Sequence, residues 1–339
     1  MSFNKYPRTL TRSPTDTLPL ITLIFMLYVN CVHADNNVNH RHEPIIPIPQ
    51  NIEFDKIKAR LGETLFFDTR LSKNNSISCA SCHQLDAGGD ENIALGISIS
   101  ADENVINTPS IFNARYNFRQ NWDGSTMTLE EQVDTAMNST HAFDNTWDEV
   151  ITALKTDPVL TKDFNDIYLD GMTKENIIDA IVEFEKTLIT PNSRFDRYLR
   201  NEAESLSKYE IDGYLKFKEL GCISCHQGIN IGGNLFQKFG VFYNYIGERG
   251  NITKHDYGRM NATERQVDKF VFKVPSLRNI AVTAPYLHDG SAETIEHAIS
   301  IMGTTQLGRT LTVDEILMIK AFLNTLTGEY NNKRLDSQP

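Results

Sequence analysis

The chain is poor in basic side chains, in cysteine and in long apolar runs, and each shortage narrows what it can be. Its 339 residues carry 33 lysines and arginines against 44 aspartates and glutamates, a net charge of −11. A nucleic-acid-binding protein needs a basic face, so we expect no nucleic-acid partner. An acidic surface can instead steer a basic electron-donor protein, or simply keep the protein soluble.

An apolar run near the N-terminus, over residues 18–29, is shorter than the ~20 apolar residues of a membrane-spanning helix. Lys5 and two arginines precede the run, and a small-residue cleavage site ending at Ala34 follows it. We therefore predict that residues 1–34 are a signal peptide and that the mature protein is periplasmic. An uncleaved membrane anchor is the alternative.

Only five cysteines are present, and four of them belong to two pentapeptides of the form C-x-x-C-H, at 79–83 and 222–226. The fifth, Cys31, lies in the predicted signal peptide. The two motifs are too far apart in the chain for one zinc-finger site. A thioredoxin-like redox pair does not explain a histidine after both motifs.

C-x-x-C-H is the attachment site of c-type haem, in which two thiols bind the haem vinyl groups and the histidine is the proximal iron ligand. The sequence therefore predicts two covalently bound haem c groups. The residues that would hold them are Cys79, Cys82 and His83 for the first, and Cys222, Cys225 and His226 for the second.

Apolar residues at helical spacing predict helices over 55–66, 173–190, around 211–220, and from 312 to a point before Gly328. Strand signals are few, and both haem motifs continue with Gln and then a Gly pair. We predict a mostly α fold made of two cytochrome c-like domains, each with one covalent c-type haem. The domains are placed at 51–191 and 192–330.

Several further segments occur in a fixed order along the chain: I-N-T-P-S (106–110), N-W-D-G (121–124), L-E-E-Q (129–132), F-K-V-P-S-L-R-N (272–279), A-P-Y-L-H-D-G (284–290) and I-M-G-T-T-Q-L-G (301–308). Together with the haem motifs, they make the chain resemble bacterial di-haem cytochrome c peroxidases and the related MauG-type enzymes of methylamine utilisation. The resemblance runs from about Ile52 to Gly328.

The resemblance implies reduction of hydrogen peroxide to water with electrons from a small cytochrome c or a cupredoxin. His83 would then be proximal on the peroxidatic haem and His226 on the electron-transfer haem. Met302 matches the axial Met of the second haem, although composition alone would favour a core residue. A His/Met pair raises the iron potential, as electron entry requires. Trp122 matches the family's Trp between the haems, and it can also serve simple packing.

Asn107, Thr283 and Pro285 match an interdomain calcium site of the family, built from side-chain and backbone oxygens. Oxygen ligands of this kind suit a hard cation. The resemblance therefore adds one calcium ion to the expected cofactors. The oligomeric state stays open, with a homodimer as one alternative.

Two departures from the family pattern affect the first haem. Many members have a His sixteen residues after the proximal His, where this chain has Ile99, so we expect a haem that is open in the resting state. The family's distal Glu is replaced by Ala142. His141 beside it is a candidate proton shuttle, or else an exposed loop residue. Gln132 matches a distal-pocket Gln, and Asn121 makes the pocket more polar.

Three functions follow from these observations. The first is a peroxidase with a constitutively open N-terminal haem. The second is a MauG-type oxidase of a protein side chain, against which the Met at 302 argues because the resemblance places a Tyr there in MauG. The third is a non-catalytic electron carrier or haem sensor. The missing Glu favours the third, while the open haem and the retained Trp122 and Gln132 disfavour it.

Overall fold

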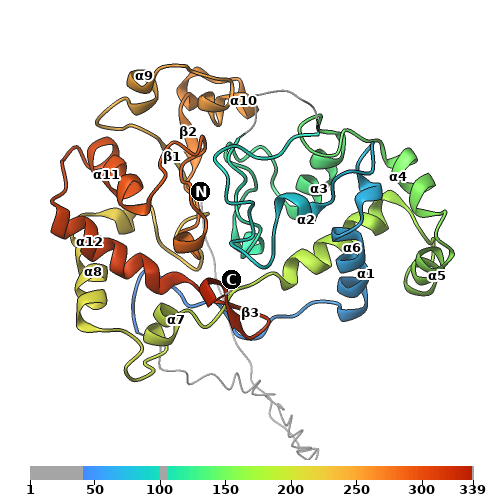
Figure 1. Ribbon diagram of the computed structural model, residues 1–339, viewed down its shortest axis with the longest axis horizontal. Coiled ribbons are helices and arrows are strands. Elements are labelled where there is room, and N and C mark those ends of the chain that lie inside the picture. Colours follow the sequence, from blue (N-terminus) through green and yellow to red (C-terminus); the bar gives the residue numbers. More distant parts are fainter. Residues whose placement is uncertain (1–40, 100–105, 338–339) are drawn as a thin grey trace, which may run out of the picture. The chain divides into compact units, whose positions relative to one another are not determined.

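The computed structural model describes residues 41–99 and 106–337, so the predicted signal peptide at 1–34 lies outside the described residues. In the described part the backbone is mostly helical, and named strands occur only as two short antiparallel pairs (Figure 1). This agrees with the predicted mostly α fold class. None of the helices in 41–99 and 106–337 is both long and apolar enough to cross a membrane.

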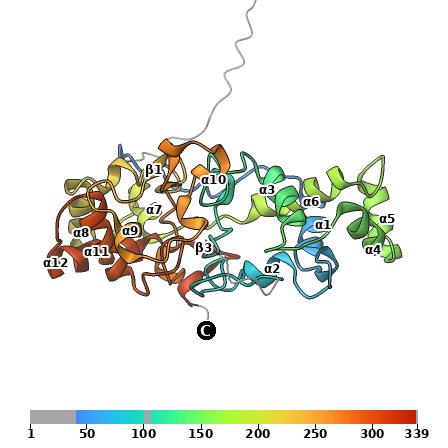
Figure 2. The ribbon, with the colours of Figure 1, turned by 90° about the horizontal axis from the view of Figure 1, so that it is seen from above.

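The first half of the chain is built on two helices that cross at close range. Helix α1 (Lys56–Phe66) begins as predicted because the Asp55 carboxylate accepts hydrogen bonds from two backbone N–H groups of the first turn. It packs against α6 (Lys174–Thr187) in both views (Figures 1 and 2). A Cβ at Gly62 would collide with the carbonyl oxygen of Ala180. The other elements of this half are η1 (Thr69–Leu71), α2 (Cys79–Cys82), η2 (Ala114–Tyr116), α3 (Leu129–Asn138), α4 (Trp147–Leu154) and α5 (Pro158–Ile167).

The second half of the chain contains the same kind of close helix crossing. Helix α8 (Lys208–Glu219) packs against α12 (Val313–Leu323), and a Cβ at Gly213 would collide with the carbonyl oxygen of Met318. One glycine-mediated crossing in each half supports the predicted duplication, while the domain bounds 51–191 and 192–330 stay a prediction. The remaining elements are α7 (Arg194–Leu199), η3 (Cys222–Ser224), β1 (Phe236–Lys238), α9 (Tyr245–Arg249), η4 (His255–Tyr257), α10 (Met260–Thr263), η5 (Gln266–Asp268), β2 (Val271–Lys273), η6 (Ile280–Val282), α11 (Ile295–Gln306), η7 (Asn324–Leu326), β3 (Glu329–Tyr330), β4 (Lys333–Arg334) and η8 (Leu335–Ser337).

Each half has its own apolar core. The core of the first half is formed by side chains that include Leu61, Leu65, Val150, Leu154, Phe164, Ile177 and Ile181. The core of the second half includes Phe195, Tyr214, Phe217, Ile299, Ile319 and Phe322. The proline-containing segment 41–50 before α1 is here called the lead-in. Its Ile45 also belongs to the second core and forms a bridge with Gly228. The lead-in is therefore packed on the second half, which its polar sequence did not predict.

Two predicted helix bounds were wrong by a few residues. Helix α6 ends at Thr187 instead of Thr190, because Asn113 competes for the backbone there. The Asn113 N–H donates to the carbonyl oxygen of Leu188, and the Asn113 side chain accepts from the Thr190 N–H. Helix α8 starts earlier than predicted, because Ser207 forms a capping box with the third helical residue. Helix α12 starts at the predicted Thr312 cap and ends at Leu323, followed by the 3-10 turn η7, so it stops before Gly328 as predicted.

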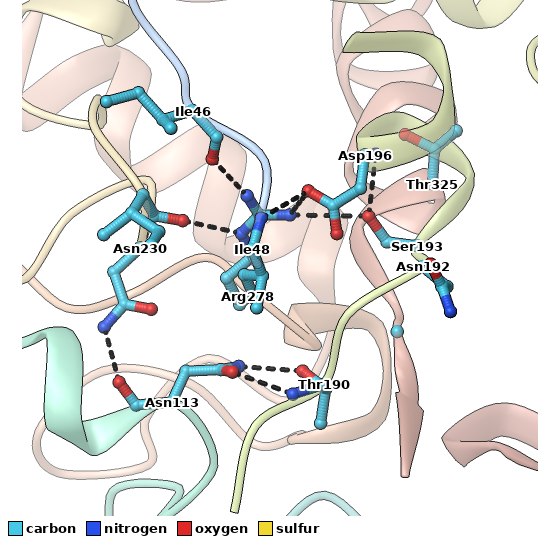
Figure 3. Close-up of polar contacts among 12 residues, drawn as sticks. Ile46, Ile48, Asn113, Thr190, Asn192, Ser193, Asp196, Asn230, Arg278 and Thr325 are labelled. Atoms are coloured by element: carbon cyan, nitrogen blue, oxygen red, sulfur yellow. Dashed lines mark hydrogen bonds and ion pairs between the residues drawn. The ribbon is translucent and has the colours of Figure 1, made fainter. Parts of the chain in front are cut away.

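A buried polar cluster joins segments from both halves (Figure 3). The guanidinium of Arg278 donates to the Asp196 carboxylate at 2.7 Å, and both side chains are no more than 1% exposed. It also donates to the carbonyl oxygens of Ile46 and Ile229. Asp196 additionally accepts from the backbone N–H of Ile48. The Arg278 guanidinium therefore binds three segments: the lead-in at Ile46, the start of α7 at Asp196, and the loop that contains Ile229.

A second group of polar contacts extends this cluster into the first half. The side chain of Asn113 donates to the Thr190 hydroxyl at 2.8 Å and accepts from the Thr190 N–H at 2.9 Å. Its carbonyl oxygen accepts from the Asn230 amide at 3.0 Å. Thr190 also contacts Asn279, next to Arg278. Because these groups are buried, each lost partner would leave an unsatisfied polar atom.

We predict that Arg278→Met will lower the free energy of unfolding by about 3–5 kcal/mol, because it leaves the buried Asp196 carboxylate without its cation. Denaturant unfolding of the holoprotein, followed by circular dichroism, measures this. The control is Lys162→Ala, which removes an exposed ion pair with Asp166 and should leave the unfolding midpoint nearly unchanged. Equal midpoints for the two variants would contradict the role given to Arg278.

Candidate functional site

The first C-x-x-C-H motif forms the short helix α2 and ends at His83. Neither Cys79 nor Cys82 is in a disulfide bond. The Nδ1 atom of His83 lies 3.0 Å from the carbonyl oxygen of Gly89. Burial lowers the pKa of His83 from its ordinary value, which favours the neutral ring. A neutral ring that donates from Nδ1 presents Nε2 as the metal-binding nitrogen.

The second motif has the same arrangement. The Nδ1 atom of His226 lies 3.2 Å from the carbonyl oxygen of Ile231, and burial lowers the pKa of His226 to about 4. Met302, on α11, packs against the same apolar core as Cys222. The structure therefore keeps Met302 in the core region of the second motif, and its bond to iron stays a prediction.

A cavity of about 300 Å³ lies against the first motif, a volume typical of small-molecule and cofactor sites. Most of its walls are apolar. Its polar and chemically reactive lining includes Cys79, Cys82, His83, Asn121, Gln132, His141, Glu185 and His255. The structure thus brings three predicted residues of the distal pocket, Asn121, Gln132 and His141, into one cavity with the predicted proximal His83.

His141 lies in the turn after α3 and is half-buried. Its backbone N–H donates to the Ser139 hydroxyl at 3.2 Å. Its Nδ1 atom is buried and has no hydrogen-bond partner among the described residues. The alternative of an exposed loop histidine therefore does not describe this side chain. Its role in proton transfer stays a prediction.

The two departures from the family pattern also lie near this cavity. Ala142 lines it and brings no acidic group. Ile97 also lines the cavity. Ile99, two residues further along the chain, is half-buried and is not part of the described lining. Besides His83, the histidines that the described residues bring to the cavity are His141 and His255.

Glu185, near the end of α6, is a cavity residue that the sequence did not reveal. It is 5% exposed, and its Oε2 atom has no hydrogen-bond partner among the described residues. Burial, with a smaller contribution from Glu130, raises the pKa of Glu185 to about 8. A glutamate in a helix normally faces solvent, so only its place beside Phe184 on the apolar face of the helix could have indicated burial.

His255 is the second cavity residue that the sequence did not reveal. It begins η4 in the second half of the chain, and its ring centroid lies 6.5 Å from that of His141 with the planes at 72°. No local pattern links these two residues, because their proximity results from the long-range packing of the two halves.

Trp122 is fixed at both its side chain and its backbone. The indole N–H donates to the carbonyl oxygen of Asn107 at 2.8 Å, and the carbonyl oxygen of Trp122 accepts from the N–H of Lys273 at 2.8 Å. Its ring lies 6.3 Å from that of His288. A tryptophan with a satisfied N–H packs well at such a junction, and its place between two haems stays a prediction.

The structure brings two of the three predicted calcium-site residues together. The Asn107 amide nitrogen lies 3.1–3.4 Å from the carbonyl oxygens of Ile93, Ala94 and Pro285. The amide turned by 180° would add its own oxygen to these three, a set that fits a hard cation. Thr283 instead contacts Ile280 through its hydroxyl, so its part in the site stays a prediction.

Lys273 supplies a further test of whether a charged cofactor fits. It is 6% exposed on β2, and no carboxylate among the described residues lies within ion-pair distance of it. Burial lowers the pKa of its ammonium group to about 8. A buried cation without an anion is costly, and haem carries propionate carboxylates that can pair with such a group. Two free cysteine pairs, two neutral histidines and this cation together fit two haem c groups.

The comparison with known proteins identifies the family. A family model described as di-haem cytochrome c peroxidase matches residues 56–204. The cytochrome c551 peroxidase of Nitrosomonas europaea is 39% identical over 325 residues, covering 94% of this chain and 95% of the relative. The chain belongs to the di-haem cytochrome c peroxidase family.

Other relatives show the breadth of this peroxidase family. The cytochrome c peroxidase Ccp of Escherichia coli (strain K12) is 42% identical over 305 residues, 90% of this chain, and this chain spans 65% of that relative's length. The methylamine utilisation protein MauG of Methylophilus methylotrophus is 28% identical, covering 75% of this chain and 74% of the relative. The crystal structure of a MauG-like protein associated with microbial copper homeostasis superposes with a TM-score of 0.72 at 26% identity, covering 85% and 94% of the two chains.

We predict that the oxidised holoprotein has one low-spin haem with His/Met ligation and one high-spin haem. We expect the second haem to have Met302 as its sixth ligand, whereas the aliphatic Ile99 side chain cannot bind the first iron. Electron paramagnetic resonance of the protein as isolated distinguishes the two. Two low-spin signals would contradict the open first haem and would make His141 or His255 the ligand to test.

Proposed function

We propose that this protein is a periplasmic, c-type di-haem cytochrome c peroxidase that reduces hydrogen peroxide to water with electrons from a small redox protein. The observation that carries this proposal is the cavity that joins the first haem motif to Gln132 and His141. The named cytochrome c peroxidases at 32–42% identity support the activity. The signal-like segment at 1–34 supports export.

The proposed cofactors are two haem c groups, held by Cys79 and Cys82 and by Cys222 and Cys225. When bound at His83, haem supplies the iron chemistry by which hydrogen peroxide, two electrons and two protons become two molecules of water. The work of the protein is then to deliver protons and electrons to one place and to exclude other ligands from it.

In this proposal His141 moves the proton at the distal side of the cavity. An imidazole nitrogen can accept and release a proton, so it can take a proton from peroxide and return it to the departing oxygen. Gln132, on α3, lines the same cavity and offers an amide N–H that stays a hydrogen-bond donor at any pH. The apolar walls keep bulk water away and so strengthen both interactions.

Electrons are proposed to enter at the Met302-ligated haem and to pass Trp122 on the way to the first. A small cytochrome c or a cupredoxin is the proposed donor. The hydrogen bonds that hold Trp122 to Asn107 and Lys273 fix the indole between segments of the two halves. One calcium ion at Asn107 and Pro285 would rigidify the same junction.

A MauG-type oxidase of a protein side chain is the second candidate. Two observations favour it: Ile99 leaves the first haem without the capping His, and MauG proteins are among the relatives at 26–28% identity. In that case the oxidising power made in the cavity would be used on a side chain of another protein. The higher identity to named peroxidases argues for the first candidate.

The deciding experiment is steady-state peroxide turnover with a reduced small cytochrome c, using oxidised enzyme that has not been reduced beforehand. Because Ile99 cannot cap the first iron, we expect turnover from the first seconds without a lag. Peroxide-dependent oxidation of a co-purifying protein, with little donor turnover, would favour the MauG-type oxidase instead. Inertness in both assays would leave an electron carrier or sensor.

His141→Ala should lower peroxide turnover by about 10²–10⁴-fold, the usual range for loss of a general acid–base group. Haem content and the signal of the Met302-ligated haem should not change, because His141 lies outside both attachment motifs. The reciprocal variant is Ala142→Glu in the His141→Ala background, which restores the family's carboxylate and should recover part of the rate. Turnover of His141→Ala within a few-fold of wild type would show that the proton moves by another route.

A further inference from the structure

The cavity at the first motif is completed by a residue from the second half of the chain. Every other described residue that lines it lies between Leu71 and Glu185, while His255 belongs to η4. The distal side of the first haem site is therefore a composite of both halves. His255 is half-buried there, with its ring edge-to-face against that of His141.

One ring nitrogen of His141 lacks a hydrogen-bond partner, and His255 is the residue placed to supply one. The Nδ1 atom of His141 is buried and has no hydrogen-bond partner among the described residues. The ring centroids of His141 and His255 lie 6.5 Å apart, so His255 is placed beside the ring whose Nδ1 atom lacks a partner. A histidine that acts as a base works best when its other nitrogen is held by an orienting group.

The position of His255 is fixed by the residue that follows it. Asp256 is 1% exposed and accepts two hydrogen bonds at 2.8 Å from the Arg249 guanidinium. Its carboxylate also contacts Nε2 of His288 at 2.8 Å and accepts from the N–H of Thr253 at 2.6 Å. Although burial opposes it, these partners lower the pKa of Asp256 from its ordinary value. Asp256 and its partners thus fix the backbone next to His255, which lines the cavity.

This chain lacks the family's distal carboxylate at its usual position in the pocket. Where the family carries a distal carboxylate, this chain has Ala142, and among the described lining residues the carboxyl group comes from Glu185 on α6 instead. A lone imidazole alternates between two tautomers, and only the one protonated at Nδ1 leaves Nε2 basic. A neighbour that accepts from Nδ1, directly or through one water, selects that tautomer.

We propose that His255 is a positioning residue that orients His141 and selects its basic tautomer, so that the two histidines together replace the missing carboxylate. This inference rests on the proposed function, because it assigns a partner to the proposed proton shuttle. His255 has no role in the proposed electron pathway. The inference requires only that a ligand that binds at the first haem must lose a proton.

Cyanide binding to the oxidised holoprotein tests this without relying on peroxide turnover. Cyanide arrives as HCN and must be deprotonated as it binds ferric haem, so a distal base speeds its association. We expect His255→Ala to slow association by about 10–100-fold, the range seen when a group that orients a functional histidine is removed. His255→Gln, which can still hydrogen-bond, should recover part of that loss. The rates are measured by stopped-flow absorbance.

The decisive comparison is the double variant. If His255 acts through His141, His141→Ala/His255→Ala should bind cyanide no more slowly than His141→Ala alone. The control is His297→Ala, an exposed histidine of α11, which should bind at the wild-type rate. The low-spin signal of the second haem should be the same in all variants, which separates this effect from loss of folding.

Two results would overturn the proposal: His255→Ala binding cyanide within twofold of wild type, or losses that multiply in the double variant. If the protein with either result still turns over peroxide, that result refutes the role of His255 and leaves the proposed peroxidase function intact. Conversely, coupled cyanide rates in a protein that does not turn over peroxide would support the histidine pair and refute the proposed peroxidase function.

Discussion

The buried ion pair between Arg278 and Asp196 is the contact on which the relation of the two halves depends. One guanidinium binds the lead-in, the start of α7 and the loop that contains Ile229, and its neighbour Asn279 reaches Thr190. Thr190 in turn is bound by Asn113 of the first half. Since an unpaired charge at this depth would be costly, these segments have one satisfactory arrangement. That arrangement also sets where the second half meets the first.

The chemistry proposed for the cavity depends on this meeting. His83, Gln132 and His141 all come from the first half, and these alone would make a pocket with one unsupported imidazole. The second half contributes His255 to the same pocket and Lys273 to the backbone of Trp122. In the proposed mechanism, proton delivery and electron delivery therefore both depend on residues from the two halves, and neither is complete within one of them.

Much of the fold followed from local patterns. The haem motifs, the Asp55 and Thr312 caps and the apolar faces of the main helices are short-range features, and the structure has them where the sequence places them. The end of α6 was misplaced because Asn113, distant in the sequence, competes for the backbone around Thr190. Long-range hydrogen bonds of this kind leave no periodic signal.

The site was predictable to the same extent and for the same reason. Gln132 and His141 could be placed in the pocket from the family resemblance, because both lie in or just after α3, close in sequence to the motif that carries it. Glu185 was missed because a helix glutamate normally points to solvent, and here burial raises the pKa of its carboxyl to about 8. His255 was missed because only tertiary packing brings η4 to the cavity. The two pocket residues that the sequence did not reveal, Glu185 and His255, thus owe their place in the cavity to burial and tertiary packing.

The central claim is that the first haem site is open and is served by His141, supported by His255. A crystal structure of the oxidised holoprotein with cyanide tests it most directly. We expect cyanide on the iron opposite His83, a nitrogen of His141 within hydrogen-bond distance of the bound ligand, and His255 hydrogen-bonded to the other nitrogen directly or through one water. A protein side chain in the cyanide position, or His141 turned toward solvent, would contradict the account.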